Sequence, residues 1–293
     1  SKELEITLTG KSCGLEERAP MCGIPYHAVE GYLSKLVSRG YKVAICEQVE
    51  DPKLAKGLVK REVIRVVTPG TNLNVQSLEA GKNNYLLSIA YTPDGIGISA
   101  ADVTTGDYYV TEVEDLKKLN DELMKYEPSE IICNEAFLVS GFDVNDLKSR
   151  LHISVNALES HMFDDDGCRR ILMKHFKVNT LIGLGVEEFP TGLLAAGALL
   201  QYLYDTQKTD LEHFTHIYPY LTSKYMLLDS STRRNLELTE TLREKQKRGS
   251  LLWVLDKTKT AMGARLLRNY IEQPLIEKDE MEKRLDAIQE LNQ

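Results

Sequence analysis

The spacing of apolar residues divides the chain into three stretches, and the first combines short strands with one helix. Residues 3–9 alternate between apolar and polar side chains, which predicts a strand. A helix is predicted next, with Gly40 as its stop signal. Its apolar side chains recur at helical spacing, at Val29, Leu33, Leu36 and Val37. Strands are predicted again at 41–46 and 63–67, and Pro69-Gly70 ends the pattern before a polar linker at 71–83.

In the second stretch, three strands precede an alternation of helices and strands. The three strands are predicted at 85–91, 95–103 and 107–113, with a turn signal at Pro93-Asp94-Gly95. The later elements are a helix that begins near 116 and ends before Pro128, a buried strand at 131–133, a further helix and strand, and a helix at 168–176. A helix at 190–204 is apolar on nearly all sides, which indicates burial inside the domain.

The third stretch, from residue 207 onward, is predicted to be helical. Side chains that can cap the amino termini of its helices are Asp229 or Ser230, then Ser250 and Thr260. The charged helical pattern at 279–293 reaches the last residue without a stop signal. We therefore expect the sequence to be a piece of a longer protein.

These patterns predict an α/β multidomain protein. The first part, at 1–82, is a partial mixed α/β domain with a linker, and the second, at 83–206, is an α/β domain around a central sheet. The third part, at 207–293, is an all-α segment.

The composition and the cysteines indicate an ordinary globular protein from a reducing compartment. Of its 293 residues, 42% are hydrophobic and 27% are charged, which is typical of a chain that buries a core. The five cysteines are odd in number and form no C-x-x-C pair, which disfavours a disulfide framework or a zinc site. The sequence has no signal-peptide pattern and no apolar run long enough to cross a bilayer. We expect a cytoplasmic protein with no membrane partner.

The net charge of −8 is concentrated in the second stretch. Residues 83–206 contain 9 Lys or Arg and 20 Asp or Glu, a net charge of −11. Residues 1–82 have a net charge of +2, and residues 207–293 have a net charge of +1. A segment that is so acidic repels a phosphate backbone. If nucleic acid is a partner, the flanking stretches are expected to contact it.

Two motifs suggest enzymatic chemistry without establishing it. TGKS at 9–12 lacks the glycine that a phosphate-binding loop needs, because Glu5 stands at that position. DVTTG at 102–106 resembles the first-hairpin loop of ribonuclease-H-like domains, in which an aspartate binds metal. A metal-dependent nuclease would need several converging carboxylates. The candidates are Asp102, Asp107, Glu127 and Glu130. The other interpretation is a turn at the end of a strand, in which Asp and Thr side chains bond their own backbone.

Two further stretches could contact nucleic acid. Residues 20–27 stiffen a loop with Pro20, Gly23 and Pro25 and place apolar and polar side chains beside them. Such a loop suits a nucleic-acid groove, and it equally suits packing on its own helix. The basic residues of 233–234 and 243–248 could bind phosphate or form a solvated helix face.

Long strings of the sequence resemble the MutS family of DNA mismatch-repair proteins. In the first stretch they are PMCGIPYHAVEGYL from Pro20, AICEQ from Ala44 and VIRVVTPGT from Val63. Farther along they are GLLAAGALLQYLYDTQ (192–207), LDSSTRRNLELTETL (228–242) and MGARLLRNYIEQPL (262–275). The strings follow the family's order over essentially the whole chain. The resemblance implies an incomplete mismatch-recognition domain, a ribonuclease-H-like connector domain without nuclease activity, and the start of a helical core and lever domain.

The resemblance also implies a function. The intact protein would recognise mismatched double-stranded DNA as a homodimer and recruit the partner MutL, with this piece as a non-catalytic scaffold that positions DNA and protein. The Phe-Tyr-Glu motif that reads mismatches would precede Ser1. The clamp and the ATPase, which uses ATP and Mg²⁺, would follow Gln293, so no cofactor is expected in this piece.

Site residues follow from the matched motifs. The DNA-proximal candidates are Lys11, Met21, Pro25, His27 and Lys35. The positions that match the MutL-contacting surface of the connector are Arg169, Arg170 and Ile171. Helical spacing places Lys174 on the same face as Arg170, so it joins the partner-binding set. No catalytic residue and no metal ligand is predicted.

Overall fold

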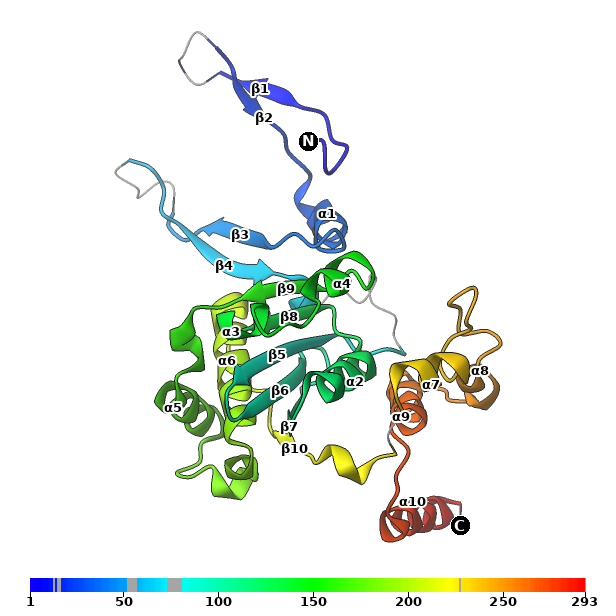
Figure 1. The fold of residues 1–293 in the computed structure, drawn as a ribbon. Helices are drawn as coiled ribbons and strands as arrows, with labels where there is room; N and C mark the ends of the chain where they lie inside the picture. The colour runs from blue at the N-terminus through cyan, green and yellow to red at the C-terminus, as the bar shows by residue number, and fades with distance from the viewer. Residues whose placement is uncertain (13, 15–16, 52–56, 73–80, 227, 293) are drawn as a thin grey trace.

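A central α/β domain carries an arm on one side and a helical segment on the other (Figure 1). The computed structural model describes residues 1–12, 14, 17–51, 57–72, 81–226 and 228–292. We call the described residues up to 72 the amino-terminal arm, residues 81–221 the central domain, and the described residues from 222 the helical segment. No helix in the described parts of the chain is both long and apolar enough to span a membrane.

A six-stranded sheet forms the middle of the central domain. In spatial order its strands are β10 (Tyr218–Pro219), β7 (Asp107–Val113), β6 (Gly95–Asp102), β5 (Tyr85–Thr92), β8 (Glu130–Cys133) and β9 (Ser154–Ala157). The strands β5, β6 and β7 form the predicted antiparallel meander. The strands β8 and β9 continue the sheet in parallel, and β10 pairs in parallel with β7. The sequence pattern did not predict β10, which has only two residues.

Helices cover both faces of this sheet. On one face lie α2 (Leu116–Tyr126), α3 (Glu135–Leu138) and α4 (Val144–Ser149); on the other lie α5 (Asp165–Phe176) and α6 (Pro190–Gln207). Neighbouring strand residues point to opposite faces. Accordingly, Leu86 packs in the cluster that contains α6, whereas Leu87 packs in the cluster that contains α2. The domain therefore has three layers, with a buried core on each side of the sheet.

Short 3₁₀ helices join several of these elements. They are η3 (Ser160–Phe163), η4 (Ile182–Leu184), η5 (Val186–Glu188) and η6 (Thr222–Lys224). Between α6 and β10, the chain is fixed by three buried side chains, Leu211, Phe214 and Ile217. The residues that follow α6 thus complete the core of the central domain.

The amino-terminal arm consists of two hairpins and one helix. Its elements are β1 (Thr9–Lys11), β2 (Ala19–Met21), η1 (Tyr26–Ala28), α1 (Val29–Val37), β3 (Val43–Gln48), β4 (Arg61–Val67) and η2 (Pro69–Thr71). The predicted helix and the predicted strands at 41–46 and 63–67 are confirmed. A small core of Leu33, Val37 and Val67 holds α1 against the hairpin of β3 and β4.

The predicted strand at 3–9 is wrong. The chain makes a turn there, in which the Glu5 backbone N–H donates to the Lys2 carbonyl oxygen at 3.3 Å. Glu5 has a φ of 55°, which a strand cannot accommodate. The strand starts only at Thr9, where pairing with β2 begins. Alternation alone does not make a strand without a partner to accept its hydrogen bonds.

The helical segment contains α7 (Ser230–Asn235), α8 (Leu251–Leu255), α9 (Ala261–Glu272) and α10 (Lys278–Leu291). The predicted caps are present on three of them. Asp229 accepts from the Thr232 N–H, Ser250 from the Trp253 N–H, and Thr260 from the Gly263 N–H. The linker part of the prediction at 71–83 lies largely outside the described residues.

Helix α6 is buried along most of its length and approaches two neighbours at glycines. At its amino terminus the Thr191 N–H donates to the Glu112 carboxylate. A Cβ at Gly97 of β6 would lie 2.0 Å from the Thr191 carbonyl oxygen. Farther along α6, a Cβ at Gly197 would lie 2.3 Å from the Cβ of Cys168 in α5. Only glycine allows these backbones to come so close.

We predict that Gly197→Ala lowers the free energy of unfolding of the central domain by about 2–3 kcal/mol, because the added methyl group overpacks a site that is bounded by backbone. Urea denaturation followed by far-ultraviolet circular dichroism measures the loss. The matched control is Gly31→Ala in α1, where a Cβ meets nothing within 4 Å. That change should be neutral or stabilising, by up to about 1 kcal/mol. Equal stability of the two variants would contradict the packing described here.

Candidate functional site

The five DNA-proximal candidates lie along the amino-terminal arm. Lys11 ends β1, Met21 ends β2, and Pro25 directly precedes η1, which contains His27. Lys35 lies in the last turn of α1, with its ammonium 5.4 Å from the centre of the Tyr32 ring. All five are exposed. The structure arranges them along an extended surface of the arm, which projects from the central domain (Figure 1).

In residues 20–27, one short turn and the exposure of two large side chains describe how the loop packs. The Ala28 N–H donates to the Pro25 carbonyl oxygen at 2.9 Å, which closes the single turn of η1. Tyr26 is 86% exposed and Met21 is 45% exposed. These side chains are therefore not packed on the helix that follows, and the loop presents them outward.

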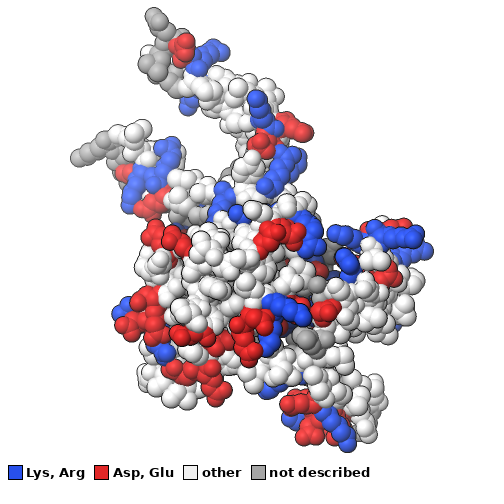
Figure 2. All heavy atoms as spheres, in the orientation of Figure 1, with Lys and Arg blue, Asp and Glu red and all other residues white. Residues whose placement is uncertain are grey.

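Charge is distributed unevenly over the surface. In Figure 2, Lys and Arg side chains lie on both hairpins of the arm and beside the helical segment. Asp and Glu side chains gather over the part of the central domain that carries α5. The concentration of acidic side chains thus lies on the central domain, as the charge distribution along the sequence predicted.

The carboxylates proposed for a metal-dependent nuclease are used in other contacts. One oxygen of Asp102 accepts from the N–H and the hydroxyl of Thr104, at 2.8 and 2.6 Å. Its other oxygen accepts from the Asn83 amide at 2.8 Å and the Asn84 N–H at 3.0 Å. Asp102 is fully buried. The Asp and Thr side chains thus bond nearby backbone, which confirms the turn interpretation of DVTTG.

Of the other three carboxylates, only Asp107 is shown beside Asp102, where both accept from the Asn83 amide. Asp107 accepts from the Thr105 hydroxyl at 2.8 Å, Glu127 pairs with Lys82, and Glu130 is buried among donors from several elements. Among the described residues, no group of three or more His, Cys, Asp or Glu side chains could hold a metal ion. The nuclease alternative is not supported.

The partner-binding candidates on α5 separate into two kinds. The Arg169 guanidinium binds both carboxylate oxygens of Glu187 at 2.8 Å and also Asp165 at 2.8 Å. These two carboxylates raise the pKa of Arg169. Ile171 packs against the core. Arg170 and Lys174 are exposed, and the described residues offer them no hydrogen bond or ion pair. Only these two cations remain available on α5.

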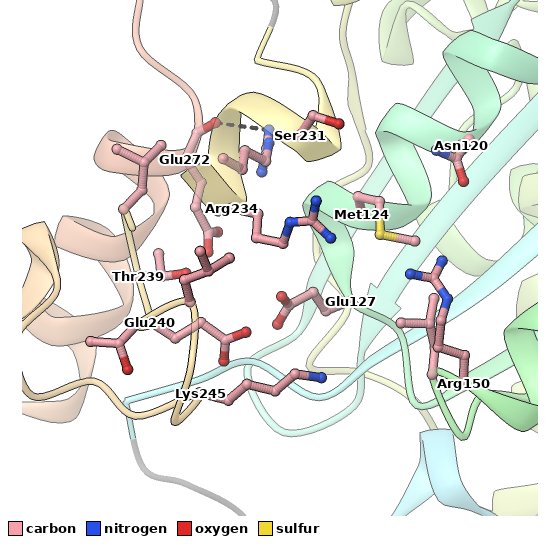
Figure 3. A pocket seen from close by; sticks show the side chains of 15 residues that line it. Asn120, Met124, Glu127, Arg150, Ser231, Arg234, Thr239, Glu240, Lys245 and Glu272 are labelled. Carbon is pink, nitrogen blue, oxygen red and sulfur yellow. Dashed lines mark hydrogen bonds between the residues drawn. The ribbon is translucent and has the colours of Figure 1, made fainter. Parts of the chain in front are cut away.

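A pocket with a volume of about 290 Å³ lies between the central domain and the helical segment (Figure 3). Met124 and Arg150 line it from the central domain, and Arg234, Lys245 and Glu272 line it from the helical segment. The dashed line in Figure 3 marks a hydrogen bond of 2.9 Å that the Arg233 guanidinium of α7 donates to the Glu272 carbonyl oxygen.

Burial of Glu272 raises the pKa of its carboxyl to about 7, although Arg268 and Arg233 lower it. Lys125 of α2 is a second buried ionisable group at this junction. It pairs with Glu122 at 2.9 Å and lies 3.9 Å from the centre of the Tyr220 ring. Burial lowers the pKa of Lys125. Sequence reasoning missed both residues, because in the sequence each belongs to the polar side of a helical pattern.

We predict that Glu272 makes stability fall as the pH rises. Between about pH 4.5 and 7 the unfolded carboxyl ionises while the folded carboxyl keeps its proton, so the free energy of unfolding decreases. The loss is about 3 kcal/mol, at roughly 1.4 kcal/mol per pKa unit. Urea titrations at several pH values should show this loss in the parent chain and its absence in Glu272→Gln. The control is Glu240→Gln in the same pocket, which should keep the parent's pH dependence.

Comparison with known proteins gives one consistent result. The model of MutS domain I matches residues 1–76, that of MutS domain II matches 84–215, and that of MutS domain III matches 231–293. The chain is 67% identical over 292 residues to the DNA mismatch repair protein MutS of Lachnoclostridium phytofermentans, and this alignment covers 100% of the chain and 31% of the relative. It is 52% identical to the protein of the same name from Ruminiclostridium cellulolyticum, with 99% of the chain and 33% of the relative covered.

The chain thus spans about a third of the length of these curated relatives. Its three matched domains follow one another in the order of the arm, the central domain and the helical segment. The chain belongs to the MutS family.

Proposed function

We propose that this chain is the part of a DNA mismatch repair protein that contacts DNA and a partner protein and does no chemistry itself. The observation that supports this proposal most directly is the exposed arm, whose rigid loop carries Met21, Tyr26 and His27 outward in a region that matches MutS domain I. The intact protein would act in the cytoplasm as a homodimer on mismatched double-stranded DNA. ATP and Mg²⁺ would act in an ATPase domain elsewhere in the intact protein.

The three parts of the chain are proposed to belong to three domains of the intact protein. Residues 1–82 belong to the mismatch-recognition domain, 83–206 to the connector and 207–293 to the start of the core. The fold supports extending the connector to β10, since Phe214 and Ile217 are buried in its core. The acidic connector would then contact protein, and the arm would contact phosphate.

DNA binding by this piece is proposed to be electrostatic and independent of sequence. Lys11 and Lys35 are the cations among the five candidates, and they supply phosphate contacts, whereas Met21, Pro25 and His27 supply a surface that fits a groove. The expected dissociation constant at physiological salt is on the order of 10⁻⁴–10⁻⁶ M, as for other non-specific binding.

We predict that Lys11→Ala and Lys35→Ala each weaken DNA binding about threefold to tenfold and lower the salt slope of the binding constant by about 1. The loss should be equal for a matched duplex and for one with a G·T mismatch. Fluorescence anisotropy at several salt concentrations measures both quantities. Lys117→Ala, an exposed lysine of α2, is the control and should change neither. Unaltered binding in both arm variants would exclude this surface.

The proposed partner surface is the exposed edge of α5. Arg170 and Lys174 are four residues apart in the helix and therefore project from the same side. They are the available cations of α5 within an acidic domain, so acidic side chains of a partner can approach them. We propose MutL as that partner, with Ile171 as a supporting apolar residue and Arg169 as a residue that holds α5 through its ion pairs.

We predict that the double change Arg170→Glu, Lys174→Glu slows the association of the intact protein with MutL by about tenfold at low salt, because complementary charge acts mainly on the association rate. Stopped-flow or surface-plasmon measurements at two salt concentrations test this. Lys117→Glu, on the opposite side of the sheet, is the control. Association rates and salt dependence that match the parent's would show that α5 does not dock MutL.

A further inference from the structure

A buried carboxylate connects the amino-terminal arm to the central domain. Glu130 begins β8 and its side chain is fully buried. One oxygen accepts from the Gly70 N–H at 3.1 Å. The other accepts from the Asn156 amide at 3.0 Å and from the Tyr202 hydroxyl at 2.8 Å. The ammonium of Lys42 lies 3.5 Å from the same oxygen. These donors come from the arm, from β9 and from α6.

Lys42 approaches this carboxylate from the arm, between α1 and β3. Its ammonium donates to the Tyr202 hydroxyl at 3.1 Å and lies 5.2 Å from the centre of the Tyr202 ring. The Lys42 side chain is 37% exposed. Its contacts with the central domain are therefore made at the rim of the buried site rather than inside it.

Gly70 reaches the same carboxylate from the residues that follow β4, at the same open end of the β3–β4 hairpin as Lys42. A Cβ at this position would lie 2.9 Å from the Leu86 Cβ and 3.1 Å from the Glu130 Cβ. The turn that holds Gly70 is fixed by reciprocal hydrogen bonds between Thr68 and Thr71. One carboxylate is thus contacted by residues that flank both strands of the hairpin, at positions 42 and 70.

These contacts restrict the orientation of the arm on the central domain as well as its position. A chain connection alone leaves two folded bodies free to rotate, whereas contacts from the ends of both hairpin strands to one buried group limit that rotation. A buried carboxylate also holds its donors firmly, because leaving it without them costs free energy. All five DNA-proximal candidates precede Lys42 in the chain and lie on the arm that this contact orients.

We propose that Glu130 and Lys42 are positioning residues that fix the DNA-facing arm on the connector. The inference rests on the proposed DNA binding for its consequence, but the contact itself is testable without DNA. Lys42 touches no DNA in this proposal, and its ammonium acts through Glu130 and Tyr202.

The first test measures arm orientation by the distance between two spin labels. One label is on Cys46, which is exposed on β3, and the other is on the cysteine introduced by Lys174→Cys on α5; Cys13→Ser and Cys22→Ser prevent additional labelling, and Cys133 and Cys168 are buried. We expect a narrow distance distribution in this background and a clearly broader one after Lys42→Met.

Three comparisons separate positioning from general destabilisation. Lys42→Arg, which keeps the cation, should restore a narrow distribution. Lys118→Met, which removes an exposed lysine paired with Glu114, should leave it narrow. Glu130→Gln should broaden the distribution if it folds, and a failure to fold leaves the decision to the Lys42 variants. A distribution after Lys42→Met that is as narrow as in the background overturns the proposal.

The second test measures binding of the full-length protein to a duplex with a G·T mismatch. Lys42→Met should weaken binding on the order of tenfold, the size of a typical coupling between sites, with the salt slope unchanged. A slope lower by about 1 would identify Lys42 as a phosphate contact and overturn the positioning role. If the parent protein does not bind DNA, the proposed function fails, and the distance measurement still decides the present inference.

Discussion

Close approach between helix α6 and its two neighbours is the constraint on which the rest of the structure depends. Gly97 brings β6 against the first turn of α6, and Gly197 brings α5 against its middle. The sheet, α6 and α5 therefore form one stack of layers in close contact. Both the arm and the helical segment are attached to this stack, so its packing sets the frame in which they are oriented.

Buried polar groups make the attachments on both sides. Glu130 collects donors from the arm, and Lys125, which pairs with Glu122, lies 5.8 Å from the centre of the Tyr225 ring in the helical segment. Apolar contacts tolerate sliding, whereas hydrogen bonds to a buried charge require one geometry. Charged groups at both joints constrain how the three parts are oriented.

The candidate surfaces could be predicted from the sequence because their residues lie close together in the chain. Pro25, Lys11 and Lys35 were predicted as DNA-proximal from local motifs, and the structure exposes all three. The pairing of Arg169 with Glu187 was not predictable, because these residues come from α5 and η5 and meet only when the chain folds. It reduces the available cations of α5 to Arg170 and Lys174. The wrong strand at 3–9 has the same origin, since a strand depends on a partner that the pattern does not contain.

The sequence by itself determined the order of elements, most of their boundaries, the caps at Asp229, Ser250 and Thr260, and the family. These features depend on periodicity and on contacts within a few residues. Only the tertiary structure decided the burial of Glu130, Lys125 and Glu272, and the addition of β10 to the sheet. A charged residue in a helical or strand pattern is expected to face water, and it is buried only when segments distant in the chain pack over it. Contacts between distant segments therefore determine where this chain departs from its sequence pattern.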